Sequence, residues 1–407
     1  MSPTEVRPIK LLVDVTCLTG PLSGIGRYTL EILSQLAQNP EQVELRGFND
    51  LGVYEPEALR RLLSTVDEPI AISSRGSTII EQRAWPLAKK IIKRIPGARQ
   101  LRANLHNKRI ARAGVQAAGS IYWQPNFILG SSQSPSIVSV YDLSHVRFPC
   151  FHPPERLRWL EDGLASSLDR AAHIMTVSRF SKAEIVDVYG ISADKISVLY
   201  PGVGDCFHQR HSLEELAVVQ RKYNLPAQYI LSLGTLEPRK NLKGLIQAYA
   251  RLSPALRKHY PLVLAGGAGW NHGETDSLIA QLASRGELIK LGFVPQAQLP
   301  ALYQNASAFA YVSLYEGFGM PIAEAMASGV PVLTSNCSSM PEVAQGSALL
   351  VDPNSVESIA QGLDKLLGEI DDGSQCSEAG RKLSHSYNWR VTADSLLDIA
   401  AALDGRT

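Results

Sequence analysis

Short apolar runs alternate with longer amphipathic segments along most of the chain. The short runs are rich in Val, Ile, Leu and aromatic residues, as buried strands are, and the segments between them have helical spacing. Strands that alternate with helices in this way pair as parallel sheets built from βαβ units. Two series of strands are predicted: 10–15 and runs near Ile121, Val138, Met175 and Val198, then 229–234, runs near Leu264 and Leu291, 308–314 and 330–335. The pattern therefore predicts an α/β protein with two sheets.

The stretch between the two series, residues 205–226, is polar and charged with a helical middle, and it is the predicted linker. We assign residues 1–205 to an N-terminal domain and 206–387 to a C-terminal domain. The chain becomes helical after Asp352 and ends in the helical segment 388–407. Ligands of open parallel sheets bind beyond the carboxyl ends of the strands. Two such domains would face each other across a deep cleft.

The composition is that of a globular protein, with 407 residues of which 45% are hydrophobic and 19% are charged. A net charge of +1 excludes binding to nucleic acid through overall charge. The five cysteines are scattered without a CxxC pair, which predicts reduced thiols rather than a zinc site or a disulfide framework. There is no signal-peptide pattern, and no window reaches the ~18 to 20 apolar residues of a spanning helix. We therefore expect a cytoplasmic protein whose membrane contact, where present, is peripheral.

The segment from Glu316 to Gly329 lies between two predicted strands and has the pattern of a loop followed by a short helix. Pro321 suits the first helical position and Gly329 the left-handed stop, so residues 322–328 are the predicted helix, with Glu324 on its first turn. The loop that leads into it consists of Gly317, Phe318, Gly319 and Met320. Glycines allow close approach of the backbone, and a helix start favours an anion such as a diphosphate. The structural alternative is that Glu324 complements the helix dipole and Glu316 is a solvated loop residue.

A second anion site is predicted after the strand 229–234, where Arg239 and Lys240 are adjacent cations. Arginine can bind phosphate oxygens in a fork, and lysine can serve as a point charge. Taken alone, such a pair is most often ordinary surface. Its place near a predicted phosphate-binding helix start favours a binding role.

Four segments together resemble the C-terminal domain of glycosyltransferase family 4: GTLEPRKN (234–241), VLAGGAG (263–269), LGFVPQAQLPALYQNA (291–306) and EGFGMPIAEAMASGVPVLTS (316–335). Members of this family are retaining, metal-independent enzymes with nucleotide-sugar donors. Their GT-B fold has two Rossmann-like domains that face each other across a cleft. The resemblance covers nearly the whole chain, so it implies this fold and this activity. It also implies that residues 1–205 are the acceptor-side domain, completed by the terminal segment 388–407 that crosses back to it, and that residues 206–387 are the nucleotide-sugar donor-binding domain.

The resemblance also implies roles for individual residues. In the family, the first glutamate of the motif contacts donor-sugar hydroxyls and the second holds the ribose, which maps onto Glu316 and Glu324. The basic pair that contacts the donor diphosphate maps onto Arg239 and Lys240. The rest of the implied nucleotide-sugar site consists of the loop residues Gly317, Phe318, Gly319 and Met320 and, from a glycine-rich loop of the N-terminal half, Gly24 and Gly26.

The segment VYDLSHVRFP (140–149) resembles a family loop that usually reads H-D-L-S, in which the histidine lies near the transferred sugar. Tyr141 occupies the position of that histidine here. Asp142 and His145 are the nearby candidates for a catalytic or acceptor-binding role. The alternative for His145 is a packed or capping side chain.

Further positions near the resembling motifs are informative. Many relatives have an arginine at the position of Thr235, and a histidine is frequent at the position of Trp123. The segment 176–185 matches a family loop near the domain junction, and Ser181 with Glu184 three residues later reads as the capping box of a helix.

From Arg83 to Arg112 the chain contains ten Lys or Arg residues and no Asp or Glu. Between Pro86 and Pro96, helical spacing separates an apolar side from a basic side formed by Lys89, Lys90, Lys93 and Arg94. The pattern fits an interfacial helix on anionic lipid, and equally a surface helix that packs on its own domain. Contact of residues 86–112 with an anionic membrane and packing within the domain are therefore alternative predictions.

Together these features predict a retaining hexosyltransferase that acts on a hydroxyl of a lipid-linked or polysaccharide glycan in O-antigen-type surface polysaccharide biosynthesis. The motifs resemble those of bacterial mannosyltransferases, so GDP-mannose or a GDP-deoxyhexose is the predicted donor, used at the inner face of the cytoplasmic membrane. No metal cofactor is expected, because the histidines are dispersed and Asp371-Asp372 lies in a polar loop. The alternatives are an epimerase or phosphorylase of the same fold, and a silent scaffold that binds nucleotide sugars.

Overall fold

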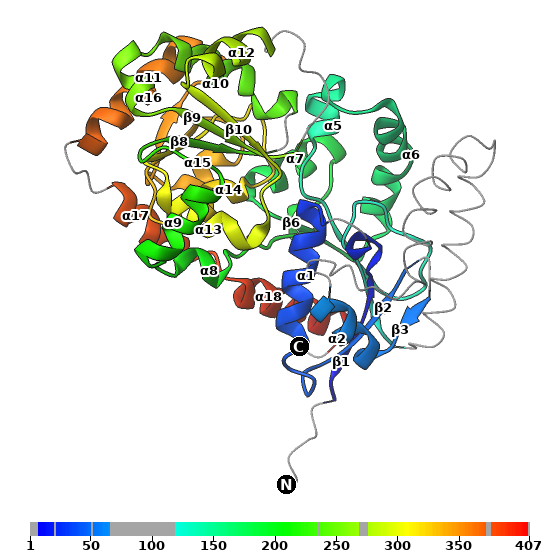
Figure 1. Ribbon diagram of the computed structural model, residues 1–407. Helices are drawn as coiled ribbons and strands as arrows, with labels where there is room; N and C mark the ends of the chain where they lie inside the picture. The colour runs from blue at the N-terminus through cyan, green and yellow to red at the C-terminus, as the bar shows by residue number, and fades with distance from the viewer. Residues whose placement is uncertain are drawn as a thin grey trace, which may run out of the picture.

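The computed structural model describes residues 7–19, 22–49, 52–65, 119–234, 237–267, 276–371 and 376–405. Within them the chain forms two parallel sheets, each flanked by helices (Figure 1). The first sheet contains β1 (Ile9–Asp14), β2 (Val43–Phe48), β3 (Val53–Tyr54), β4 (Ile121–Gln124), β5 (Ser136–Ser139), β6 (His173–Thr176) and β7 (Ile196–Val198). Its order is β3-β2-β1-β4-β5-β6-β7, and only β3 of these strands runs antiparallel to its neighbour.

The second sheet contains β8 (Ile230–Leu233), β9 (Leu262–Ala265), β10 (Leu288–Gly292), β11 (Ala308–Tyr311), β12 (Val332–Ser335) and β13 (Leu349–Val351). Its order is β10-β9-β8-β11-β12-β13. Both sheets therefore wind outward from a central pair, β1 with β4 and β8 with β11, at which the strand order reverses. The predicted α/β class with two Rossmann-like sheets is confirmed. The pattern of apolar runs did not predict β2, β3 and β13.

Helices cover both sheets. They are α1 (Gly24–Leu36), α2 (Pro56–Thr65), α5 (Ser144–Arg147), α6 (Pro154–Arg170), α7 (Arg179–Tyr189), α8 (Asp205–His208), α9 (Leu213–Lys222), α10 (Leu242–Arg251), α11 (Pro254–His259), α12 (Asp276–Ser284), α13 (Leu299–Asn305), α14 (Met320–Ala327), α15 (Met340–Ala344), α16 (Val356–Asp371), α17 (Cys376–Ser384) and α18 (Trp389–Leu403). Two short 3-10 turns lie near the site, η2 (Pro149–Phe151) and η4 (Pro238–Lys240).

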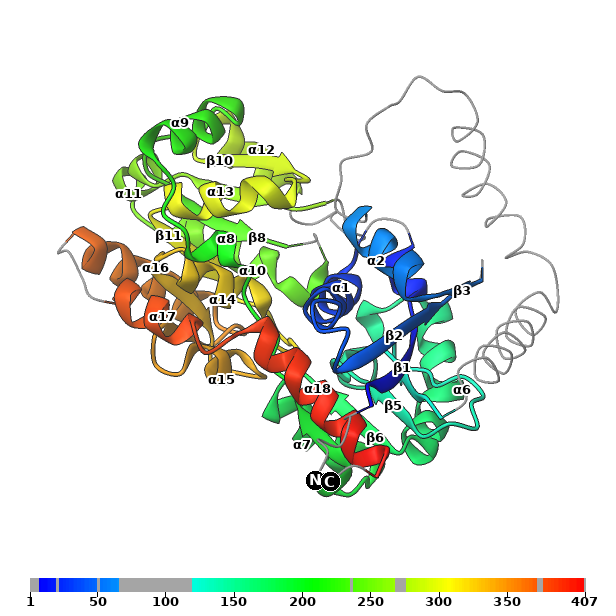
Figure 2. The ribbon, with the colours of Figure 1, turned by 90° about the horizontal axis from the view of Figure 1, so that it is seen from below.

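The last helix, α18, returns to the first sheet and packs against α1 (Figure 2). Its N-cap, Asn388, accepts hydrogen bonds from Arg390 N and Val391 N, which satisfies the first free amides of the helix. The chain can cross here only because residue 202 is glycine, since a Cβ atom would lie 2.2 Å from Trp389 N. A helix that joins the two domains is what the terminal segment predicted.

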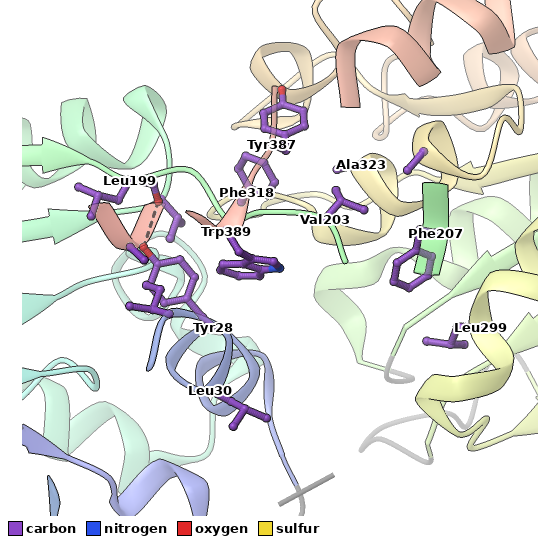
Figure 3. Packing of buried hydrophobic residues seen from close by; sticks show 14 of the residues in the cluster. Tyr28, Leu30, Leu199, Val203, Phe207, Leu299, Phe318, Ala323, Tyr387 and Trp389 are labelled. Carbon is purple, nitrogen blue, oxygen red and sulfur yellow. Dashed lines mark hydrogen bonds between the residues drawn. The ribbon is translucent and has the colours of Figure 1, made fainter. Parts of the chain in front are cut away.

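Aromatic side chains fill the junction where α18 crosses. Tyr28 of α1 donates a hydrogen bond to the carbonyl of Leu199 and packs edge-on against Trp389, with ring centroids 5.6 Å apart (Figure 3). Phe318 and Tyr387 meet edge-on at 5.3 Å on the side of the second sheet. The apolar core is therefore continuous between the two domains at this crossing.

Two predictions of local structure need correction or limits. The cap of α7 is Ser178, whose Oγ accepts from Ser181 N, so the predicted capping box on Ser181 and Glu184 is wrong. The basic residues 86–112 lie outside the described residues, so neither of their predicted roles is tested. In the part of the chain that the structure describes, no helix combines the length and the apolar composition needed to cross a membrane.

Candidate active site

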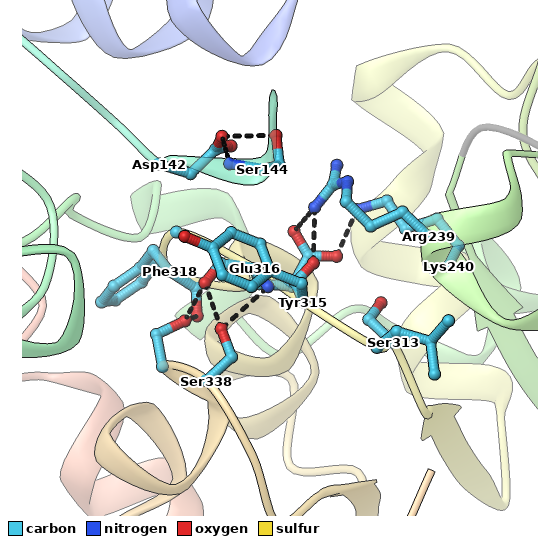
Figure 4. A network of polar contacts seen from close by, with 12 residues as sticks. Asp142, Ser144, Arg239, Lys240, Ser313, Tyr315, Glu316, Phe318 and Ser338 are labelled. Carbon is cyan, nitrogen blue, oxygen red and sulfur yellow. Dashed lines mark hydrogen bonds and ion pairs between the residues drawn. The ribbon is translucent and has the colours of Figure 1, made fainter. Parts of the chain in front are cut away.

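Arg239, Lys240 and Glu316 come together because β8 and β11 are neighbours at the centre of the second sheet. Arg239 and Lys240 follow β8 in η4, and Glu316 follows β11. Arg239 Nη1 lies 2.7 Å from Glu316 Oε2, and Lys240 Nζ lies 2.7 Å from Oε1 (Figure 4). The hydroxyl of Tyr311 donates to the same Oε1 at 2.8 Å. Three side chains predicted from separate motifs thus form one cluster at the carboxyl end of the sheet.

The charges of this cluster stabilise one another. Burial alone would raise the pKa of Glu316, but Arg239 and Lys240 outweigh that effect and lower the pKa to about 2. Burial also lowers the pKa of Lys240, against the attraction of Glu316. Arg239 is shared, since its Nη2 lies 2.8 Å from Glu237 Oε1. Glu316 is therefore a permanently ionised acceptor that orients both cations, a pairing that the sequence did not show.

The loop between β11 and α14 is held from both domains. Ser338 Oγ accepts from Glu316 N at 2.9 Å, which anchors the backbone on the side of the second sheet. Ser178 Oγ donates to the carbonyl of Gly317 at 2.6 Å from the side of the first sheet. A Cβ atom on Gly317 would lie 2.1 Å from the carbonyl oxygen of Tyr141, so only glycine allows the domains to meet here.

The other loop residues have different surroundings. Gly319 has φ 104°, in the left-handed region, and caps α14. Phe318 is buried against Tyr387, so its side chain belongs to the apolar junction, and its predicted contact with the donor stays a prediction. The helix begins at Met320 rather than at residue 322, with Pro321 in its first turn, whereas Gly329 has φ 76° as its predicted stop requires.

Glu324 occupies a separate environment. The prediction that it lies on the first turn of the helix is wrong, because α14 begins at Met320 and Glu324 lies beyond its first turn. Its Oε2 accepts from the hydroxyl of Tyr303 at 3.0 Å. Burial raises the pKa of this carboxyl to about 7, against smaller lowering effects of Tyr303 and of Arg27. Arg27 belongs to α1, so a charge of the other domain acts on Glu324. Arg27 is not among the residues predicted for the site, although it directly follows Gly26.

Gly24 and Gly26 begin α1, whose cap Ser23 accepts from Gly26 N. A Cβ atom on Gly26 would lie 2.7 Å from the carbonyl oxygen of Cys17, while one on Gly24 would meet no atom within 4 Å. Gly26 is therefore explained by the close approach of α1 to the backbone of the 3-10 turn Thr16–Leu18. Gly24 has no such packing reason, and its predicted contact with the donor stays a prediction.

Asp142 lies just before the start of α5 in the first domain, and His145 lies in α5. Asp142 Oδ1 accepts from both Ser144 N at 2.9 Å and Ser144 Oγ at 2.6 Å, at the first residue of this helix (Figure 4). His145 is 5% exposed, and its Nε2 has no hydrogen-bond partner in the described part of the protein. Burial lowers its pKa to about 4, with the charge of Asp142 acting in the opposite direction. The imidazole is thus neutral near pH 7 and has a free nitrogen.

Positions that depart from the common family residues are structural here. Tyr141 donates its hydroxyl hydrogen bond to the carbonyl of Pro125 at 2.8 Å and packs against Tyr28. Trp123 is fully buried and donates from Nε1 to Ser139 Oγ. Thr235 lies outside the described residues. Among those residues no group of His, Cys, Asp and Glu side chains has the arrangement of a metal site.

Comparison with known proteins identifies the family. Residues 22–205 match the model described as Glycosyltransferase Family 4, and residues 218–383 match that of Glycosyl transferases group 1. The chain is 35% identical to the O-antigen chain mannosyltransferase B of Escherichia coli over 382 residues, which is 94% of this chain and 96% of the relative.

Solved structures show the same fold. A glycosyltransferase from Rickettsia africae superposes with a TM-score of 0.65 at 18% identity, covering 97% of this chain and 98% of that one. Anabaena HepE, solved in complex with UDP and glucose, superposes with a TM-score of 0.63 at 17% identity, covering 97% and 99%. The similarity to the Escherichia coli relative extends along nearly the full length of both chains, and the solved structures share the fold. The chain therefore belongs to glycosyltransferase family 4 and is a glycosyltransferase with the GT-B fold.

Proposed function

We propose that the protein transfers a mannosyl residue from GDP-mannose, or a hexose from a GDP-deoxyhexose, to a hydroxyl of a lipid-linked or polysaccharide glycan. The similarity to the Escherichia coli O-antigen chain mannosyltransferase B supports mannose as the transferred sugar and an O-antigen-type glycan as the product, and the donor nucleotide is proposed on the family resemblance. A second curated relative, the O-antigen chain mannosyltransferase RfbU of Salmonella typhimurium, is 29% identical over 54% of this chain.

The observation that carries the proposal is the cluster of Arg239, Lys240 and Glu316 at the reversal point of the second sheet. Such points bind the ligands of doubly wound sheets. In our proposal Arg239, Lys240 and the first amides of α14 stabilise the charge that develops on the leaving diphosphate. Glu316 keeps both cations oriented and accepts hydroxyl hydrogen bonds of the transferred sugar. Glu324 accepts hydrogen bonds of the ribose.

The bond that breaks joins the anomeric carbon to the diphosphate, and the bond that forms joins that carbon to the acceptor oxygen. We propose retention of configuration and no metal requirement, both on the family resemblance. The two cations provide positive charge at the position where a metal would otherwise act. Transfer should therefore be unchanged in EDTA, and loss of activity that Mg²⁺ restores would contradict this part of the proposal.

We also propose that the enzyme works at the inner face of the cytoplasmic membrane, where residues 86–112 contact anionic lipid. Replacing Lys89, Lys90, Lys93 and Arg94 with Gln should reduce sedimentation with phosphatidylglycerol vesicles and leave sedimentation with phosphatidylcholine vesicles unchanged. Equal sedimentation of both proteins with the anionic vesicles would argue against membrane contact.

The test of the donor is to incubate the purified protein with GDP-mannose, UDP-glucose and UDP-N-acetylglucosamine and to measure release of nucleoside diphosphate and nucleotide binding. We expect release from GDP-mannose that Glu316→Ala lowers at least ~100-fold. Glu287→Ala is the matched control, because it breaks a buried ion pair with Arg257 (2.9 Å) in the same domain. Turnover of a UDP-sugar alone would overturn the donor, and an equal loss in both variants would overturn the role of Glu316.

A further inference from the structure

Tyr315 contacts both the charged cluster of the second domain and a loop of the first domain. It is 4% exposed and directly precedes Glu316. Its carbonyl oxygen accepts from Arg239 Nη1 at 2.7 Å, the same nitrogen that contacts Glu316. Its hydroxyl reaches the other domain, where it accepts from Leu143 N at 3.0 Å and donates to Glu184 Oε2 at 2.8 Å. The backbone of Tyr315 is thus part of the charged cluster (Figure 4), and its side chain is bonded to the acceptor-side domain.

The partners of the Tyr315 hydroxyl are themselves held in place. Glu184 of α7 is 9% exposed and lies 2.6 Å from Arg147 Nη2, which also lies 3.0 Å from Asp187. Burial raises the pKa of the Tyr315 hydroxyl well above its ordinary value, so it keeps the proton that it donates to Glu184. The rings of Phe148 and Phe180 pack on Tyr315 with centroids 5.6 and 5.5 Å away. Water is thereby kept from a hydrogen bond that neither domain can complete alone.

Leu143 is the point at which this bond acts on the acceptor-side loop. It is fully buried and lies between Asp142 and the first turn of α5, which carries His145. The hydroxyl of Tyr315 is the acceptor for its buried amide, which would otherwise be left without a partner at a substantial cost in free energy. A shift of Tyr315 would therefore move the segment 142–145 relative to Glu316.

We infer that Tyr315 is a positioning residue that fixes the distance between the charged cluster of the donor side and the loop 142–145 of the acceptor side. The inference rests on the proposed function, because it assigns the donor to one partner of this contact and the acceptor to the other. Reacting groups must be held in a narrow range of geometry, and a displacement of about 1 Å can cost 100-fold in rate.

The test is Tyr315→Phe, which keeps the ring and its packing and removes only the hydroxyl. With the nucleotide sugar that the wild type turns over, we expect kcat to fall ~10- to 100-fold, while the Kd of the corresponding nucleoside diphosphate changes less than twofold. Hydrogen–deuterium exchange of the amides in 142–148 should become faster. The matched control is Tyr249→Phe, which removes a fully buried hydroxyl bonded to carbonyls within the second domain, including Glu287 O at 2.8 Å. We expect kcat of this control within twofold of the wild type.

Equal kcat in Tyr315→Phe and wild type, or an equal loss in Tyr249→Phe, would overturn the inference. Glu184→Gln provides a second variant, because its amide oxygen can still accept from Tyr315, and it should retain more activity than Tyr315→Phe. A different donor for the wild type would refute the proposed function alone, since the ratio of variant to wild type is measured with whichever donor reacts. The exchange rates test the contact without any turnover.

Discussion

Glu316 and Glu324 belong to one loop and the helix that follows it, yet their carboxyl groups behave in opposite ways. Glu316 is buried and Glu324 is half-buried. Glu316 has two cations within 2.7 Å, and its pKa is about 2. Glu324 has a neutral tyrosine hydroxyl at 3.0 Å, and its pKa is about 7. Burial raises the pKa of both carboxyls, and charged neighbours outweigh it only at Glu316.

This contrast suits the two roles proposed for them. A permanently charged Glu316 can hold Arg239 and Lys240 in place and still accept hydrogen bonds. A carboxyl that is half protonated near pH 7 can either accept from or donate to a hydroxyl. Sequence position alone would have given both glutamates the same ordinary pKa.

The largest effect is expected for Glu316→Gln, which removes the charge that stabilises Arg239 and Lys240. Breaking a buried pair on one side leaves the other charge uncompensated, so the free energy of unfolding should fall by about 3 kcal/mol at pH 7. Because the pKa of Glu316 is depressed, its stabilisation is present above the ordinary glutamate pKa of 4.5 and is lost as the pH falls through about 2. Urea unfolding at several pH values measures this. A change below 0.5 kcal/mol at pH 7 would show that the pairing contributes little.

Replacing Glu324 with Gln should change the free energy of unfolding in the opposite direction. Glu324→Gln resembles the protonated form, so the free energy of unfolding should rise by about 2 kcal/mol at pH 8. The raised pKa means that the protonated group's stabilisation is complete below 4.5 and is lost as the pH rises through about 7. The variant and the wild type should therefore converge at pH 4.5. Denaturant unfolding at both pH values checks this, and destabilisation at pH 8 would remove the contrast with Glu316.

The smallest change in the free energy of unfolding is expected at His145. Burial lowers the pKa of this base, whereas it raises the pKa of the acid Glu324. The His145 pKa of about 4 lies below the ordinary histidine pKa of 6.5, so its stabilisation is full above 6.5 and is lost as the pH falls toward 4. His145→Gln should gain about 1 kcal/mol relative to the wild type on acidification from pH 7.5 to pH 6. Thermal unfolding at the two pH values gives the measurement, and parallel curves would exclude a buried neutral imidazole.

Continuous apolar runs predicted their strands well, as residues 308–314 did for β11 (Ala308–Tyr311). The missed strand β2 (Val43–Phe48) contains Glu44 and Arg46, which pair with each other at 3.0 Å. That polar pair interrupts the apolar run, so composition did not reveal the strand. The capping box failed because Ser178 and Ser181 are equally good caps by residue type, and the contact of Ser178 with Gly317 of the other domain comes from the tertiary structure.

The sequence by itself determined the alternation of strands and helices, the stop at Gly329 and the residue types of the site, because these depend on local spacing and side-chain chemistry. Tertiary structure alone decided that β8 lies beside β11 and hence that Arg239 and Lys240 bind Glu316. It also decided that Tyr315 reaches Leu143 and Glu184 in the other domain. The physical reason is that charge state and alignment depend on neighbours brought close by strand order and domain contact, which no local pattern of residues specifies.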